Sequence, residues 1–157
     1  MEAIGFSAPV RTKEPQLKGR RRTSIARAIG KRDWRSNVYN DEQDKYHLMH
    51  CIGEAHQQFE SIIVAFCIMS NHFHILIKSK EKLSKIMARI SRRCSDYYSN
   101  RYLHVGRIYQ RRCFAKAIED PHVLLIVSCY FHRNPLEAKI PMVIDLHHYP
   151  LSSYPSY

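Results

Sequence analysis

The pattern of apolar and polar positions along the chain predicts three helices and four strands. Helices are expected where apolar residues recur every three or four positions, over residues 41–59, 83–97 and 121–133. Strands are expected in shorter runs rich in β-branched and aromatic residues, at 23–29, 61–69, 72–78 and 113–118. Asp120 is a favourable N-cap for the third helix, and Asn134, which precedes a proline, is expected to end it.

The order of these elements predicts the fold class. Only Ser70 and Asn71 separate the second and third strands, so these strands must pair as an antiparallel hairpin. The order strand, helix, hairpin, helix, strand, helix predicts an α+β fold, a ferredoxin-like or RRM-like sandwich whose mainly antiparallel sheet has four or five strands. The 157 residues fit a single domain, expected over residues 23–157 and preceded by a flexible basic arm at 1–22. The segment after the third helix is expected to be mostly irregular.

The net charge of +11 and the pI near 9.6 are large for a chain of this size. Such a charge attracts polyanions, chiefly nucleic acid or an anionic membrane. Its concentration in patches argues against a role in solubility alone, and the charge favours nucleic acid as the partner. A hydrophobic content of 45% with 25% charged residues excludes a disordered chain. No apolar run reaches the roughly 20 residues of a membrane helix, and no signal-peptide core is apparent. A soluble cytoplasmic protein without a membrane partner, nucleoid-associated if bacterial, is therefore expected.

Five cysteines are scattered along the chain, at positions 51, 67, 94, 113 and 129. None belongs to a C-x-x-C pair, and an odd number cannot all form disulfides within one chain. This pattern argues against a zinc finger and against a disulfide framework, and it fits reduced thiols in a cytoplasm.

Two histidines stand at alternate positions of the third predicted strand, in the stretch IMSNHFHILIK. Side chains alternate along a strand, so His72 and His74 share one face while Phe73 points to the other. Two imidazoles on one face form half of a site for a divalent metal ion. Taken alone, such a pair more often means surface or hydrogen-bonded histidines without a ligand role.

The third predicted helix places a tyrosine and an asparagine on one face. Tyr130 and Asn134 stand at positions i and i+4, which are neighbours on a helix. A tyrosine oxygen can act as a covalent nucleophile, and an asparagine carbonyl is an oxygen ligand for metal ions. If this face meets the strand that carries the histidines, one site holds ligands and nucleophile together. Periodicity alone favours the simpler reading, an aromatic in the core and an asparagine that ends the helix.

Together these residues resemble the HUH single-tyrosine transposases, specifically the REP-associated tyrosine transposase type. The family's histidine motif usually reads MPNHVH, and this chain has MSNHFH at 69–74. The nucleophile motif RYIHxNPVRA is matched by CYFHRNPLEA at 129–138. Three further motifs, GxxWQxRF, YPxSSYxxY and FxDDxD, resemble the stretches GRIYQRRCF at 106–114, YPLSSYPSY at 149–157 and VYNDEQD at 38–44. The resemblance runs from about Thr23 to the C-terminus.

The resemblance implies a metal-dependent endonuclease and strand transferase, a transposase that acts on single-stranded DNA and recognises DNA hairpins. It makes His72 and His74 metal ligands, Asn134 the third ligand and Tyr130 the nucleophile. The implied cofactor is Mg²⁺ or Mn²⁺, which would bind the scissile phosphate. Attack by Tyr130 would leave a 5′-phosphotyrosine and a free 3′-OH. The sequence leaves both a monomer and a homodimer open.

This chain departs from the family's motifs at four positions, none of which removes a catalytic group. Ser70 replaces the usual proline, and Tyr109 replaces the usual tryptophan. Cys129 stands where an arginine is usual, and Glu137 where a basic residue is usual. The last two substitutions change the charges available for DNA contacts near the nucleophile.

DNA is expected to contact arginines of the second helix, of the segment before the fourth strand and of the third helix. These are Arg89, Arg92, Arg93, Arg107, Arg111, Arg112 and Arg133. Tyr97, Tyr98 and Tyr102 are candidates for stacking on bases, although the spacing of Tyr97 also predicts burial.

Two other functions are compatible with a basic α+β chain. A domesticated relative would bind DNA at repeats without cutting it, but the intact histidines, tyrosine and asparagine favour the enzyme. An RNA-binding module of ferredoxin-like fold would need aromatic residues on the face of the sheet, and the stretch HILIK does not supply them.

Overall fold

The computed structural model describes residues 24–31, 39–106, 108–109 and 114–156. Its strands are β1 (Ser24–Lys31), β2 (Ile62–Ile68), β3 (His72–Ser79) and β4 (Phe114–Ile118). Its helices are α1 (Glu42–Gln58), α2 (Leu83–Tyr102) and α3 (Pro121–Glu137), followed by the short 3-10 helices η1 (Leu146–His148) and η2 (Tyr154–Ser156). The predicted order of helices and strands is confirmed. The predicted basic arm at 1–22 lies outside the described residues.

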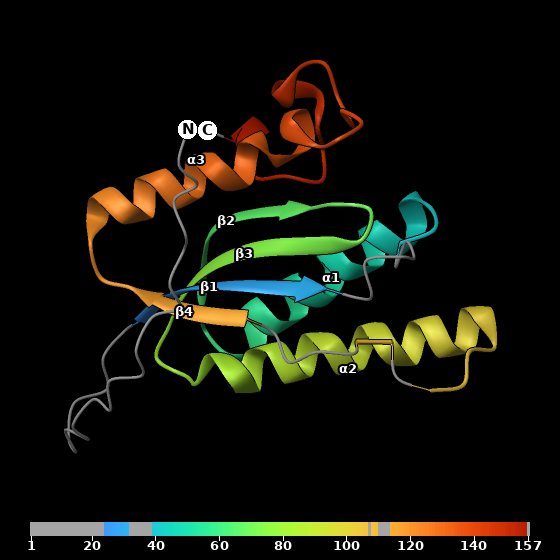
Figure 1. Cartoon of the computed structure of the whole chain (residues 1–157). Helices are drawn as coiled ribbons and strands as arrows, with labels where there is room; N and C mark the ends of the chain where they lie inside the picture. Colours follow the sequence, from blue (N-terminus) through green and yellow to red (C-terminus); the bar gives the residue numbers. More distant parts are fainter. Residues whose placement is uncertain (1–23, 32–38, 107, 110–113, 157) are drawn as a thin grey trace, which may run out of the picture.

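The strands form an antiparallel sheet in the order β2-β3-β1-β4. Helices α1 and α2 cover one face of this sheet, and α3 lies over the other face (Figure 1). The α+β prediction, with helices packed on an antiparallel sheet, is therefore confirmed. Because β3 is an inner strand with helices over both of its faces, it is buried almost continuously from Phe73 to Ile77.

The larger part of the core lies between the sheet and the layer of α1 and α2. Leu48 of α1, Phe73 of β3 and Ile90 of α2 are completely or almost completely buried. Burial of each such side chain stabilises the fold by about 1.5–3 kcal/mol. Because Phe73 points into this core, its neighbours His72 and His74 must point toward α3.

Two helices end later than their sequences predict. Helix α2 continues to Tyr102 and ends where Leu103 adopts the left-handed conformation, with φ 49°. Asp120 caps α3 as predicted, but the predicted end before Pro135 is wrong, because α3 includes this buried proline and continues to Glu137. A proline lacks one N–H, so it removes a single hydrogen bond, and here that loss falls close to the end of the helix.

The segment after α3 is more ordered than predicted. Besides η1 and η2 it contains Ser152, which pairs antiparallel with Cys67 along the outer side of β2. The C-terminal segment thus adds a short pairing to the sheet beside its outermost strand. The cysteines in the described part of the chain are free thiols, as predicted.

Candidate active site

The two histidines converge at the start of β3. Nε2 of His72 lies 3.0 Å from Nε2 of His74, and the two rings are nearly perpendicular, at 86°. Nδ1 of His72 donates a hydrogen bond to Oδ1 of Asn71, at 2.6 Å. This bond places the proton of neutral His72 on Nδ1, so its Nε2 carries the lone pair that faces His74. The prediction that both side chains share one face is confirmed.

This pair of nitrogens suits a divalent ion. Adjacent ligands of an octahedral ion, each about 2.1 Å from it, stand about 3.0 Å apart. That distance matches the separation of the two Nε2 atoms. Across the described ranges, no group of three His, Cys, Asp or Glu side chains is placed to hold an ion. A complete site would therefore need a ligand of another kind, such as an amide oxygen.

Helix α3 brings Tyr130 next to the histidine pair. His74 is only 2% exposed, and its ring lies 4.7 Å from that of Phe131. The Tyr130 ring stands edge-on to His74 with 5.8 Å between centroids, yet Tyr130 remains 44% exposed. The predicted meeting of α3 with the histidine strand is confirmed, and the simpler reading of Tyr130 as a core aromatic is wrong. A phenol beside two imidazoles and open to solvent can be reached by a substrate.

Asn134 follows Tyr130 by one helical turn. Its Nδ2 donates a hydrogen bond to the backbone carbonyl of Tyr130, at 2.6 Å. Because the amide nitrogen makes this bond, Oδ1 is the amide atom suited to a metal ion. The role of Asn134 as a ligand stays a prediction.

The predicted DNA-binding arginines of α2 do not lie at this site. Arg89 and Arg92 are exposed on α2, which covers the opposite face of the sheet from α3 (Figure 1). Arg93 is bound to Glu54 of α1 through two hydrogen bonds of 3.0 and 3.1 Å. The helical face that carries them was predicted from local spacing, which does not show on which side of the sheet a helix packs.

Arg133 is on the same helix as Tyr130. Its guanidinium forms an exposed ion pair with Glu137, at 2.8 Å, one turn further along α3. The departure from the family motif at position 137 therefore places a negative charge against this arginine. The other predicted arginines, Arg107, Arg111 and Arg112, lie outside the described residues.

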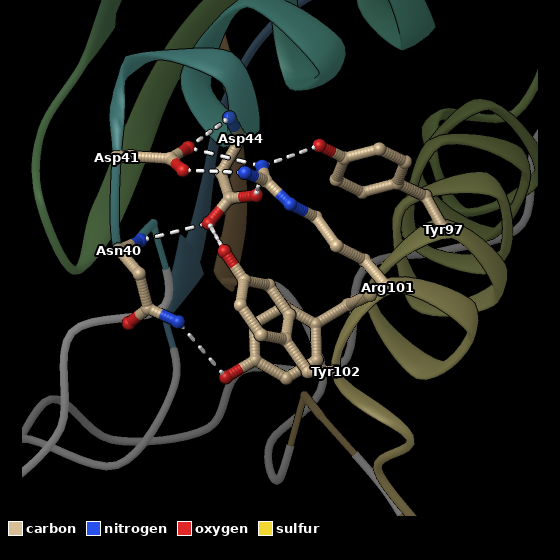
Figure 2. A network of polar contacts seen from close by, with 7 residues as sticks. Asn40, Asp41, Asp44, Tyr97, Arg101 and Tyr102 are labelled. Carbon is tan, nitrogen blue, oxygen red and sulfur yellow. Dashed lines mark hydrogen bonds and ion pairs between the residues drawn. The ribbon is translucent and has the colours of Figure 1, made fainter.

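All three tyrosines predicted to stack on bases belong to a polar network at the start of α1 (Figure 2), in which the Tyr98 hydroxyl accepts a hydrogen bond from Nδ2 of Asn40 at 3.5 Å. Arg101 of α2 donates to the carboxylates of Asp41 and Asp44, and at 2.7 Å to the hydroxyl of Tyr97. The hydroxyl of Tyr102 donates to Asp44, at 2.8 Å. The hydrogen bond from Arg101 holds the pKa of the Asp41 carboxyl below its ordinary value. These bonds join α1 to α2, and the role of Arg101 was not foreseen because the two aspartates lie far from it in the sequence.

Sequence reasoning also missed a contact between α3 and the C-terminal segment. His132 is buried, and its Nε2 lies 2.9 Å from Oγ of Ser153. Burial lowers the pKa of His132. Both residues stand within motifs that carry the family resemblance, at 129–138 and 149–157, and that is the signal in the sequence that points to them.

The part of the chain that holds the histidines and Tyr130 matches a known family. The family model described as "Transposase IS200 like" matches residues 26–134, from β1 to Asn134. The chain belongs to the IS200-like transposase family. The resemblance seen in the motifs is thereby confirmed, and membership gives this transposase a general activity in DNA cleavage and transposition.

Two solved structures share the fold of this transposase at low sequence identity. A REP-associated tyrosine transposase bound to a REP hairpin superposes with a TM-score of 0.69 at 17% identity, over 94% of this chain and 84% of that chain. A putative transposase from Deinococcus radiodurans R1 gives 0.52 at 14% identity, over 74% and 95%. Curated proteins give no significant match. Among the described residues, no helix is both long enough and apolar enough to cross a membrane.

Proposed function

We propose that this transposase cleaves and rejoins single-stranded DNA through Tyr130, with His72, His74 and Asn134 as ligands of a divalent ion. The observation that carries the proposal is the Tyr130 ring beside His74, whose Nε2 lies 3.0 Å from that of His72. The order of elements and the strand order β2-β3-β1-β4 support a ferredoxin-like scaffold for this site. On that scaffold the ligands come from an inner strand and the nucleophile from the helix above it.

The proposed reaction is a transesterification. Oη of Tyr130 attacks the scissile phosphorus, and the Oη–P bond forms as the bond from phosphorus to the 3′ oxygen breaks. The phenol loses its proton and the departing 3′ oxygen gains one, so the products are a 5′-phosphotyrosine and a free 3′-OH. The phosphotyrosine bond conserves the energy of the cleaved phosphodiester. A 3′-OH can later attack the phosphorus of this bond, which rejoins the strands and releases the Tyr130 hydroxyl.

When bound, Mg²⁺ or Mn²⁺ would neutralise the negative charge that develops on the phosphate oxygens. His72 and His74 would supply its nitrogen ligands, and Oδ1 of Asn134 its oxygen ligand. Asn71 would support this set by accepting a hydrogen bond from Nδ1–H of His72, which keeps the Nε2 lone pair directed toward the ion.

A DNA hairpin with a single-stranded flank is the proposed substrate. The structurally similar REP-associated transposase is bound to a REP hairpin, and the net charge of +11 attracts phosphates. We assign to Arg133 the phosphates next to the cleavage point, because it shares α3 with Tyr130. Arg89 and Arg92 would contact DNA that passes to the α2 side of the sheet.

The test is incubation of the protein with an end-labelled hairpin oligonucleotide, with Mn²⁺, with Mg²⁺ and with a chelator. We expect a covalent protein–DNA adduct that needs the metal. Tyr130→Phe should abolish the adduct, because it removes the attacking oxygen, while hairpin binding in a gel-shift assay is kept. Tyr46→Phe is the matched control, since it removes a similarly exposed tyrosine hydroxyl from α1, on the opposite face of the sheet.

Other outcomes distinguish the remaining functions. Hairpin binding by the wild type without any adduct would contradict the enzyme and favour a DNA-binding protein that does not cut. Preference for an RNA hairpin over the DNA hairpin of the same sequence would favour an RNA-binding module. His72→Ala and His74→Ala should each lose the adduct with Tyr130 intact, and an undiminished adduct would exclude them as ligands.

A further inference from the structure

Helix α3 packs on the rest of the molecule along one face, where Leu124 and Val127 are partly buried against the core and three later side chains are buried. The side chains that it buries are Phe131, His132 and Pro135, all in its second half. Its first half carries apolar residues that face solvent, with Leu125 64% and Ile126 66% exposed. The most deeply buried contacts that hold α3 therefore lie within a few residues of Tyr130.

One of these contacts comes from the C-terminal segment. Oγ of Ser153 lies 2.9 Å from Nε2 of His132, and the Tyr154 ring stands at 67° to the His132 ring, 5.5 Å between centroids. His132 and Tyr130 are two positions apart on a helix, so their side chains point in nearly opposite directions. The segment thus holds α3 on the side away from Tyr130.

The segment is itself fixed to β2 by hydrogen bonds of its backbone and side chains. The N–H of Ile68 donates to the carbonyl of Leu151 at 2.9 Å, and the N–H of Ser153 donates to the carbonyl of Phe66 at 3.1 Å. The N–H of Phe66 donates in turn to Oγ of Ser153 at 3.0 Å. The same hydroxyl oxygen therefore contacts both the edge of the sheet and His132.

From β2 these contacts lead to the histidine pair. Cys67 of β2 stands opposite His74 of β3 in the antiparallel register, and its other neighbour is Ser152 of the C-terminal segment. One short path of hydrogen bonds therefore links the strand that holds His74 to the helix that holds Tyr130. A reacting group misplaced by about 1 Å can lose about 100-fold in rate.

We propose that Ser153 and His132 are positioning residues, which set α3 so that Tyr130 stands correctly over the histidine pair. They touch neither substrate nor metal and act through the placement of the helix. This inference rests on the proposed function, because it assigns to Tyr130 the reaction described above. It also assigns a purpose to the C-terminal motif that the proposed reaction does not use.

The first test is the rate of adduct formation in a single turnover at saturating hairpin and Mn²⁺. Ser153→Ala should lower this rate by about 10- to 100-fold, while the hairpin Kd is unchanged. Ser153→Thr, which keeps the hydroxyl, should restore the rate. His132→Gln, whose Nε2 can replace that of the imidazole, should lose less than His132→Ala. Ser156→Ala, which removes an exposed hydroxyl of the same segment, is the matched control and should react as the wild type does.

Urea denaturation shows whether every variant is folded under assay conditions, so slow reaction by a folded variant reflects position rather than unfolding. A Ser153→Ala protein that reacts at the wild-type rate would overturn the inference. Equal losses in rate and in hairpin affinity, or no rescue by threonine, would also overturn it.

A second readout does not depend on catalysis. With 3-fluorotyrosine at position 130, the ¹⁹F chemical shift reports on the His74 ring beside it. Ser153→Ala should shift or broaden this signal, and Ser153→Thr should restore it. If the wild type forms no adduct, the proposed function fails, and the ¹⁹F signal still decides the inference: an unchanged signal in Ser153→Ala contradicts it, and a changed and rescued signal supports it.

Discussion

The two faces of the sheet are covered by helices that are held in different ways. On one face, α1 and α2 share a continuous apolar core with β3, and charged pairs join them at the rim, Arg93 with Glu54 and Arg101 with two aspartates. On the other face, α3 buries three side chains, Phe131, His132 and Pro135, and leaves Tyr130 exposed. The comparison indicates that the first face supplies most of the stability, while the second holds a reactive side chain accessible to substrate.

The largest difference between the faces should appear on truncation of a core side chain. Phe73 is completely buried and points to the α1 and α2 layer, so Phe73→Ala should lower the free energy of unfolding by about 3–5 kcal/mol. Leu125→Ala, on the exposed side of α3, should change it by less than about 0.5 kcal/mol. Urea denaturation measures both, and similar losses in the two variants would contradict the comparison.

A smaller effect is expected from substitution of Asp44, which is buried beside Arg101 and accepts a hydrogen bond from the Tyr102 hydroxyl (Figure 2). Asp44→Asn should cost about 2–3 kcal/mol in unfolding free energy, less than for a fully buried pair, because Arg101 remains partly solvated. Asp96→Asn, at an exposed position of α2, is the control. If Asp44→Asn is as stable as this control, the network does not join the helices.

Acidification should weaken the α1 and α2 side through its rim. Hydrogen bonds from Arg101 and Arg93 lower the pKa of Asp41 and of Glu54. A carboxyl whose pKa is lowered in the folded state stabilises it above the unfolded pKa, and this contribution is lost as the pH falls through the lowered value. We therefore expect the urea concentration at the midpoint of unfolding to decrease as the pH is lowered below about 4. In Asp41→Asn the midpoint should decrease less steeply with falling pH. A profile parallel to that of the wild type would show that this carboxyl does not contribute to the pH dependence.

The smallest effect is expected for Arg93→Ala. Its ion pair with Glu54 is partly exposed, so the loss in the free energy of unfolding should be small even in low salt. The difference from the wild type should shrink at 1 M salt, because screening acts on exposed charges. A loss that is independent of salt would mean that the side chain contributes by packing rather than by charge.

Sequence patterns were sufficient for features determined by local chemistry. Asp120 before Pro121 predicted the start of α3, and strand alternation predicted that His72 and His74 share a face opposite Phe73. The i and i+4 spacing of Tyr130 and Asn134 predicted a common stretch of helix. These features depend on near neighbours in the chain, which is why they could be predicted.

Features that depend on distant partners were not predicted. The spacing of Arg93 on α2 suggested a surface for DNA, yet its partner is Glu54, 39 positions away in the sequence. Pro135 suggested a helix end, because helix propensity takes no account of tertiary packing, which here stabilises a buried proline within the helix. Nor did any local pattern predict that Ser153 would meet Phe66 and His132.

The C-terminal segment has a consequence for how molecules of this protein meet one another. β2 is the outermost strand on its side of the described sheet, and the segment occupies the backbone donors and acceptors between Phe66 and Ile68. An uncovered strand of this kind is a template on which another chain can add its own strand. Leu151 to Ser153 therefore cover this edge against self-association. A shortened protein without them would expose the edge of β2 to strand pairing with another molecule.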